Sequence, residues 1–331
     1  MNMSTLVGIA FTFKIFMWSL YPLASSYSLE VMNPFALMFA VQLAAYLGAM
    51  TFAIIALARR RQFREYAELQ VSLGWDGIWL IVGAGACSAF SHVFFVMALT
   101  MVNKNGVSIL FESWPIMALF FAPHIIEKDW RKSTARDYII GAVALAGVCI
   151  IILSDEHITM ADGSGWDVNA FLAYGLALAA SYLTAMLVLM RGSYGQKLQP
   201  LKNNFAGAMI SEMMVRFVAT ILLAVVGLAF GFNMTVPTSE WSAIIFIGVG
   251  IFALGGAAYT FALVNARSPN IMLFDYLIPI LAVVWLVMAG MSEINAGLII
   301  GGTMTIGSCV YLLWCNNRQK KAEARQAQAA V

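Results

Sequence analysis

Long apolar stretches separated by short polar segments make up almost the whole of this 331-residue chain. Because a helix rises about 1.5 Å per residue, roughly 20 apolar residues are enough to cross the hydrocarbon layer of a membrane. The stretches are twice as long as barrel strands and do not alternate in polarity, which argues against a β-barrel. The pattern predicts ten spanning helices, at 5–26, 34–57, 76–101, 107–126, 137–154, 169–190, 205–230, 241–264, 270–291 and 296–315.

The composition agrees with this class. The chain is 61% hydrophobic and 11% charged, whereas soluble domains contain about 25% charged residues. Its net charge of +2 gives no reason to expect a nucleic acid partner. Cys87, Cys149, Cys309 and Cys315 lie in or at the ends of apolar stretches without metal-ligand spacing, so we expect buried thiols, no metal and no cofactor.

Basic residues predict the orientation, because they concentrate in cytoplasmic loops. The loops after the second, fourth, sixth and eighth predicted spans, together with the tail, contain 16 of the 19 Lys and Arg residues. These are Arg59, Arg60, Arg61, Arg64, Lys128, Arg131, Lys132, Arg136, Arg191, Lys197, Lys202, Arg267, Arg318, Lys320, Lys321 and Arg325. We therefore expect a multi-pass protein of the inner (plasma) membrane with both termini in the cytoplasm.

The two halves of the chain resemble each other. Residues 107–115 read VSILFESWP in the fourth span, and residues 271–279 read IMLFDYLIP in the ninth. Each half contributes five spans, and because five is odd, the second copy must be inverted in the membrane. The predicted fold is an all-α membrane protein of two inverted five-helix repeats, at 1–157 and 166–317, followed by a cytoplasmic tail at 318–331. Inverted repeats of this kind are typical of secondary transporters.

Ten spans in two inverted halves, short loops and a proline within the fourth and ninth spans resemble the drug/metabolite transporter superfamily, EamA-type branch. The segment His92-Val93-Phe94-Phe95 with Trp114 is similar to aromatic amino acid exporters of the YddG type. In those proteins a histidine and several aromatic residues on these two spans line a central cavity. The resemblance implies tyrosine at Phe95 and Glu112, and this departure bears on the substrate rather than on the fold.

Charged groups at bilayer depth cost at least ~2.5 kcal/mol each, so they usually face a partner or a wet cavity. Lys14 and Glu112 are candidates to pair with each other or to hold the carboxylate and the amine of a substrate. Glu112 is also a candidate proton carrier. Asp275, with Tyr276, is either a counterpart of this site on the inner side or a cap for backbone freed by the helix break at Pro279.

Other polar and aromatic residues within the spans complete the candidate site. Glu212 and Arg216 are four residues apart on one helix face, which predicts an ion pair with either a structural or a gating role. His92 is a cavity candidate. Trp18 and Trp114 are candidates to stack on cargo or to hold a cation, and Pro115 predicts a break in the fourth span.

These features predict a transporter rather than an enzyme. The expected function is export of small amphipathic metabolites by alternating access, with amino acids, including aromatic ones, as the leading candidates. An organic-cation or quaternary-ammonium carrier is the first alternative, and a membrane-embedded enzyme is the alternative of another class. The expected partners are a small-molecule substrate, the lipid bilayer and protons as a candidate coupling ion, and the protein is expected to be a monomer or a weak oligomer.

Overall fold

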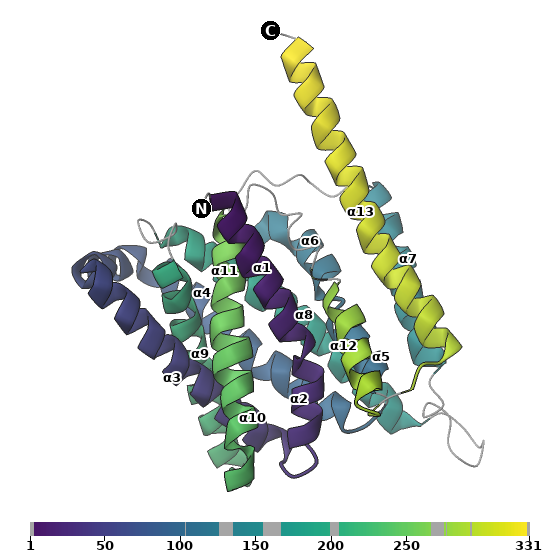
Figure 1. Cartoon of the computed structure of the whole chain (residues 1–331), viewed down its shortest axis with the longest axis horizontal. Coiled ribbons are helices and arrows are strands. Elements are labelled where there is room, and N and C mark those ends of the chain that lie inside the picture. Colours follow the sequence, from purple (N-terminus) through teal and green to yellow (C-terminus); the bar gives the residue numbers. More distant parts are fainter. Residues whose placement is uncertain are drawn as a thin grey trace.

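The chain forms a bundle of helices, and every regular element among the described residues is helical (Figure 1). The structure is a computed structural model that describes residues 3–102, 104–125, 135–154, 167–198, 205–265, 275, 277–291 and 293–329. In chain order the elements are α1 (Met3–Ser19), α2 (Tyr21–Ser28), α3 (Pro34–Arg60), α4 (Phe63–Leu99), α5 (Lys104–Phe111), α6 (Trp114–Ile125), α7 (Ala135–Leu153), α8 (Val168–Lys197), α9 (Phe205–Phe230), η3 (Thr238–Glu240), α10 (Trp241–Ile245), η4 (Phe246–Gly255), α11 (Gly256–Asn265), α12 (Leu277–Met288) and α13 (Ala296–Ala329).

Six helical stretches among the described residues are long and apolar enough to cross a membrane. They are Met3–Ser28, Pro34–Arg59, Phe63–Leu99, Val168–Lys197, Phe205–Phe230 and Thr238–Asn265. Shorter apolar helices lie at Ile139–Ile151, Leu277–Met288 and Ala296–Ser308. Large apolar side chains also face outward, among them Phe16 on α1, Trp79 on α4, Leu228 on α9 and Ile299 on α13. A surface of this kind suits lipid rather than water.

Helix bounds differ from the predicted spans mainly where polar residues continue a helix. α9 coincides with the predicted span at 205–230. α4 begins well before residue 76 and bends at Gly74, whose φ of 52° favours glycine. α8 runs on to Lys197, past the predicted end at 190. α13 continues through most of the predicted tail to Ala329, since that segment is rich in good helix formers.

The predicted fourth span consists of two short helices. α5 ends at Phe111, and α6 begins at Trp114 with Pro115 as its second residue. Proline suits this position because the first helical N–H groups have no intrahelical acceptor. Pro279 likewise lies in the first turn of α12. Glu112 and Ser113 therefore lie between two helix ends.

The stretch Thr238–Asn265 is one continuous rod with a π-helical middle, η4. π-helical turns widen the hydrogen-bond ladder and often occur at functional sites. α10 and α11 mark the two ends of this rod, which runs along the front of the bundle beside α1 and α2 (Figure 1). The start of α1 and the end of α13 lie at the same end of the bundle (Figure 1).

Candidate functional site

A buried salt bridge joins two candidate site residues that lie near opposite ends of the chain. Lys14 Nζ on α1 lies 2.5 Å from Asp275 Oδ1, and both side chains are almost completely excluded from solvent. The sequence offered Glu112 as one candidate partner of Lys14, and Asp275 as either an inner-side counterpart of the site or a backbone cap. The structure instead brings Asp275 to Lys14.

Four aromatic rings surround the Lys14 ammonium group. Its Nζ lies 4.5 Å from the ring centre of Tyr259 and 5.6 Å from that of Trp114. The rings of Trp18 and Phe11 lie at 5.8 and 5.9 Å. These distances are within the range of cation–π attraction, about 6 Å. Aromatic side chains from α1, α6 and α11 therefore form a cage suited to an ammonium group.

Glu112 lies beside this cage, in the break between α5 and α6. Its Oε2 accepts a hydrogen bond of 3.2 Å from Trp114 Nε1, and the residue is 2% exposed. No salt bridge to Glu112 occurs within the described part of the chain. Because a buried carboxylate without a cation is costly, this position is suited to take up a positively charged group.

A second charged network connects α8 and α9. The Glu212 carboxylate accepts hydrogen bonds from Arg191 on α8 and from Arg216 Nε, the latter at 3.1 Å. Arg216 Nη1 also donates to Ser88 Oγ on α4 at 2.6 Å and to Gln42 Oε1 on α3 at 3.2 Å. All these side chains are buried. The network ties four helices together and contains two cations for one anion.

The placement of Arg191 corrects its assignment to a cytoplasmic loop. Because α8 continues beyond the predicted span end, Arg191 lies within the bundle and is 3% exposed. Among the described residues, Lys14, Arg191 and Arg216 are the buried cations, and Glu112, Glu212 and Asp275 are the buried anions. The buried charges therefore balance, with an excess negative charge near Lys14 and an excess positive charge near Arg216.

Tyr259 on α11 lies between the two networks. Lys14 Nζ is 4.5 Å from its ring centre, and Arg191 Cζ is 5.7 Å from the same centre. Its hydroxyl group is near Asp275. Neither this hydroxyl nor Asp275 Oδ2 makes a hydrogen bond of ordinary geometry within the described residues. The Tyr259 ring thus separates the region around Lys14, which has an excess negative charge, from the region around Arg216, which has an excess positive charge.

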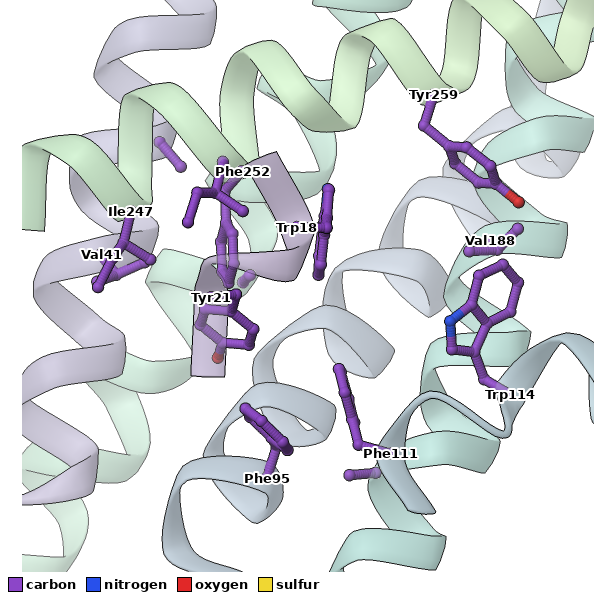
Figure 2. Packing of buried hydrophobic residues seen from close by; sticks show 14 of the residues in the cluster. Trp18, Tyr21, Val41, Phe95, Phe111, Trp114, Val188, Ile247, Phe252 and Tyr259 are labelled. Atoms are coloured by element: carbon purple, nitrogen blue, oxygen red, sulfur yellow. The ribbon is translucent and has the colours of Figure 1, made fainter. Parts of the chain in front are cut away.

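Aromatic residues pack together in the interior (Figure 2). They border the arginine network, since Arg216 Cζ lies 4.6 Å from the ring centre of Phe252. Phe252, from η4, stacks on Trp18 with ring centres 5.4 Å apart, and its ring lies 5.2 Å from Tyr21 and 4.5 Å from His92. Phe95 and Phe111 pack at 4.2 Å on the other side of Tyr21 (Figure 2). The walls of the candidate site are therefore mainly aromatic.

His92 is held by the backbone of its own helix. Its Nδ1 lies 2.7 Å from the Ser88 carbonyl oxygen, and because a carbonyl only accepts, Nδ1 carries the proton. Nε2 is left as an acceptor, and it has no hydrogen-bond partner among the described residues. His92 thus faces the aromatic cluster with an unsatisfied nitrogen.

Most of the predicted site residues lie in one region. Lys14, Trp18, Glu112, Trp114 and Asp275 meet around the ammonium cage, while His92 and Phe95 belong to the adjacent aromatic cluster. Tyr276 lies outside the described residues. Arg191, Tyr259 and Phe252 were not predicted as site residues. The position of Arg191 directly after the apolar residues that end at Met190 was the available signal, whereas Tyr259 and Phe252 look like ordinary apolar positions.

Comparisons with known proteins identify a similar fold but no protein family. One solved crystal structure of another protein aligns with a TM-score of 0.65 over 96% of this chain and 99% of that chain, at 17% sequence identity. At this identity the likeness shows a shared fold alone. No protein-family model and no curated protein matches the sequence.

Proposed function

We propose that this chain is a secondary transporter of the inner membrane, with cytoplasmic termini, that exports small amphipathic metabolites carrying an amino group. Amino acids are the leading substrate class. The resemblance of His92-Val93-Phe94-Phe95 with Trp114 to aromatic amino acid exporters favours the aromatic ones, whereas the departures at Phe95 and Glu112 count against them. The observation that carries the proposal is the buried Glu112 carboxylate, which forms no salt bridge among the described residues and lies beside an aromatic cage already holding one ammonium group.

The contacts between helices support two inverted repeats. Each element of the first repeat has an expected counterpart in the second. In chain order, the first repeat consists of α1–α2, α3, α4, α5–α6 and α7, and the second of α8, α9, the 238–265 rod, α12 and α13. When each element is replaced by its counterpart, the principal helix contacts map onto one another. The contact of α4 with α8 becomes that of the rod with α1, and α4 with α9 becomes the rod with α3. The contact of α6 with α8 becomes that of α12 with α1. The pairs α3–α9 and α7–α13 map onto themselves.

Close glycine contacts follow the same exchange. A Cβ added to Gly85 on α4 would lie 3.1 Å from the Val215 carbonyl oxygen on α9. A Cβ added to Gly248 on the rod would lie 2.7 Å from the Val41 carbonyl oxygen on α3. Such small residues let helix backbones approach closely in membranes. The equivalence supports a rocking movement of one repeat against the other, which would open the closed site to either side in turn.

A carrier for organic cations is the second candidate. The cage around Lys14 favours it, because aromatic rings with nearby carboxylates are also suited to quaternary ammonium groups. Lys14→Ala separates the two functions. Loss of Lys14 alone should destabilise the bundle, so transport is measured per amount of folded protein. On that basis an amino acid carrier should lose transport when the charge balance beside Asp275 changes, whereas a cation carrier should retain or improve transport when the competing ammonium is removed.

Thermal stabilisation of the purified protein by amino acids, amines and quaternary ammonium compounds tests the proposal. Stabilisation by the true ligand should be lost in Glu112→Gln, which keeps the acceptor for Trp114 but removes the charge. Glu68→Gln, at an exposed site on α4, is the matched control. The proposal fails if no compound gives a stabilisation that depends on Glu112.

A further inference from the structure

The arginine network contains hydrogen-bond donors that no protein group satisfies. Arg216 is completely buried, yet its Nη2 has no hydrogen-bond partner among the described residues. Trp18 Nε1 is also buried and is likewise unsatisfied within that part of the chain. An unsatisfied buried donor is costly, and such groups in a native structure call for an explanation.

Both donors lie at the same part of the 238–265 rod. Trp18 stacks on Phe252, and the Arg216 guanidinium carbon lies 4.6 Å from the ring centre of Phe252. Trp18 Nε1 is close enough to Gly255 that a Cβ added there would be 3.3 Å away. The Glu212 carboxylate, which binds Arg216 Nε, lies against the next residue, Gly256.

The charge of this region favours an anion. Arg191 and Arg216 share a single carboxylate, Glu212, so one positive charge is left over. Lys14, which the sequence offered as the carboxylate-binding residue, is already paired with Asp275. His92 supplies an acceptor rather than a donor, because its proton is on Nδ1. Arg216 Nη2 and Trp18 Nε1 are therefore two buried N–H donors of this region that are available to a ligand's oxygens.

We propose that Arg216 and Trp18, beside Gly255 and Gly256, bind the carboxylate of the transported molecule, while Glu112 takes its ammonium group. This inference rests on the proposed transport function and specifies its substrate class as molecules that carry both an amine and a carboxylate. Arginine is well suited to the task because its guanidinium group presents planar, charged donors to a carboxylate. The missing side chain at Gly255 leaves space beside Trp18 Nε1, which would lie 3.3 Å from a Cβ added there.

Three probes that differ only in their charged groups test the inference. They are phenylalanine, phenethylamine without the carboxylate, and 3-phenylpropionate without the amine, with dissociation constants measured by calorimetry on the purified protein. Trp18→Phe keeps an aromatic ring against Phe252 and removes the N–H donor together with part of the ring, and phenethylamine controls for the lost volume. We expect it to weaken binding of phenylalanine and 3-phenylpropionate about tenfold, the effect of one hydrogen bond to a charged group, and to leave phenethylamine unchanged.

Further variants keep the test decisive. Gly255→Ala should act like Trp18→Phe, because its methyl group would fill the space beside Nε1. Glu112→Gln should show the opposite pattern and weaken only the two amine-bearing probes. Trp79→Phe, on the exposed side of α4, is the matched tryptophan control. Arg216→Lys adds a direct test of the guanidinium if that variant folds.

The outcomes separate the inference from the proposed function. If Trp18→Phe and Gly255→Ala leave carboxylate binding unchanged, or weaken phenethylamine equally, the inference is overturned. If the wild-type protein binds only phenethylamine, the inference also fails, while a carrier for amines stands. If none of the three probes binds, the inference is overturned, and the ligand screen with Glu112→Gln decides whether the proposed function stands.

Discussion

Lys14 Nζ and Asp275 Oδ1 lie 2.5 Å apart although the two residues are separated by 261 positions in the chain. The salt bridge connects α1 to the residues just before α12, and neither side chain reaches the surface. A pair of this kind is sensitive to the loss of one partner, since the remaining charge stays buried without compensation.

Removing either charge alone should therefore destabilise the protein more than removing both. We expect Lys14→Met or Asp275→Leu to cost about 3–5 kcal/mol, and the double variant to recover much of that loss. Thermal unfolding in detergent, followed by circular dichroism, measures the three variants against wild type. Additive losses in the double variant would contradict the pairing.

Removal of the Glu112 charge should have the opposite effect on stability to removal of Lys14 or Asp275 alone. Because this buried carboxylate has no salt bridge within the described residues and accepts only from Trp114, the neutral amide of Glu112→Gln should fit equally well. We expect an unfolding temperature equal to or above that of wild type in the absence of ligand. A fall of several degrees would mean that a cation balances Glu112 in the folded protein.

Glycine at 256 is required by the ion-pair network rather than by the helix. A Cβ added there would lie 2.6 Å from Glu212 Oε1, so Gly256→Ala should push the carboxylate away from its arginine partners. We expect a loss of about 2 kcal/mol or more, as for other disrupted buried ion pairs. Unfolding midpoints of purified variants measure this effect.

Gly175 provides the matched control, because a Cβ on this α8 glycine would meet nothing within 4 Å. Gly175→Ala should be neutral or stabilise by about 0.5–1 kcal/mol, since alanine is the better helix former. Equal effects of the two substitutions would show that crowding at Glu212 is not the reason for glycine at 256.

The sequence predicted the helical class and several contacts for identifiable physical reasons. Apolar length alone indicates spanning helices, and the spacing of Glu212 and Arg216 is sufficient to predict that they meet on one helix face. Partners distant in sequence could not be predicted in this way. Spacing says nothing about whether Lys14 meets Glu112 or Asp275, because that choice depends on how α1 packs against α12.

Arg191 shows a second limit of the sequence. Basic residues near the end of an apolar stretch normally mark a loop, and that rule assigns Arg191 to the cytoplasm. The buried Glu212 on the neighbouring helix holds it inside instead. Likewise, Phe252 and Tyr259 become site residues only because the 238–265 rod lies beside α1.

The arrangement of the chain ends gives a prediction about orientation. The start of α1 and the end of α13 lie at one end of the bundle, and the connection between α2 and α3 lies at the other (Figure 1). In a cysteine-free background, Ser4→Cys and Arg318→Cys should therefore share one side of the membrane, and Glu30→Cys should lie on the opposite side. All three positions are exposed.

Because basic residues favour the cytoplasm, a membrane-impermeant maleimide should label only Glu30→Cys in intact bacterial cells and should label the other two in inverted vesicles. Labelling of Ser4→Cys and Arg318→Cys from different sides would rule out an even number of spans, and with it the two five-helix repeats on which the proposed alternating access depends.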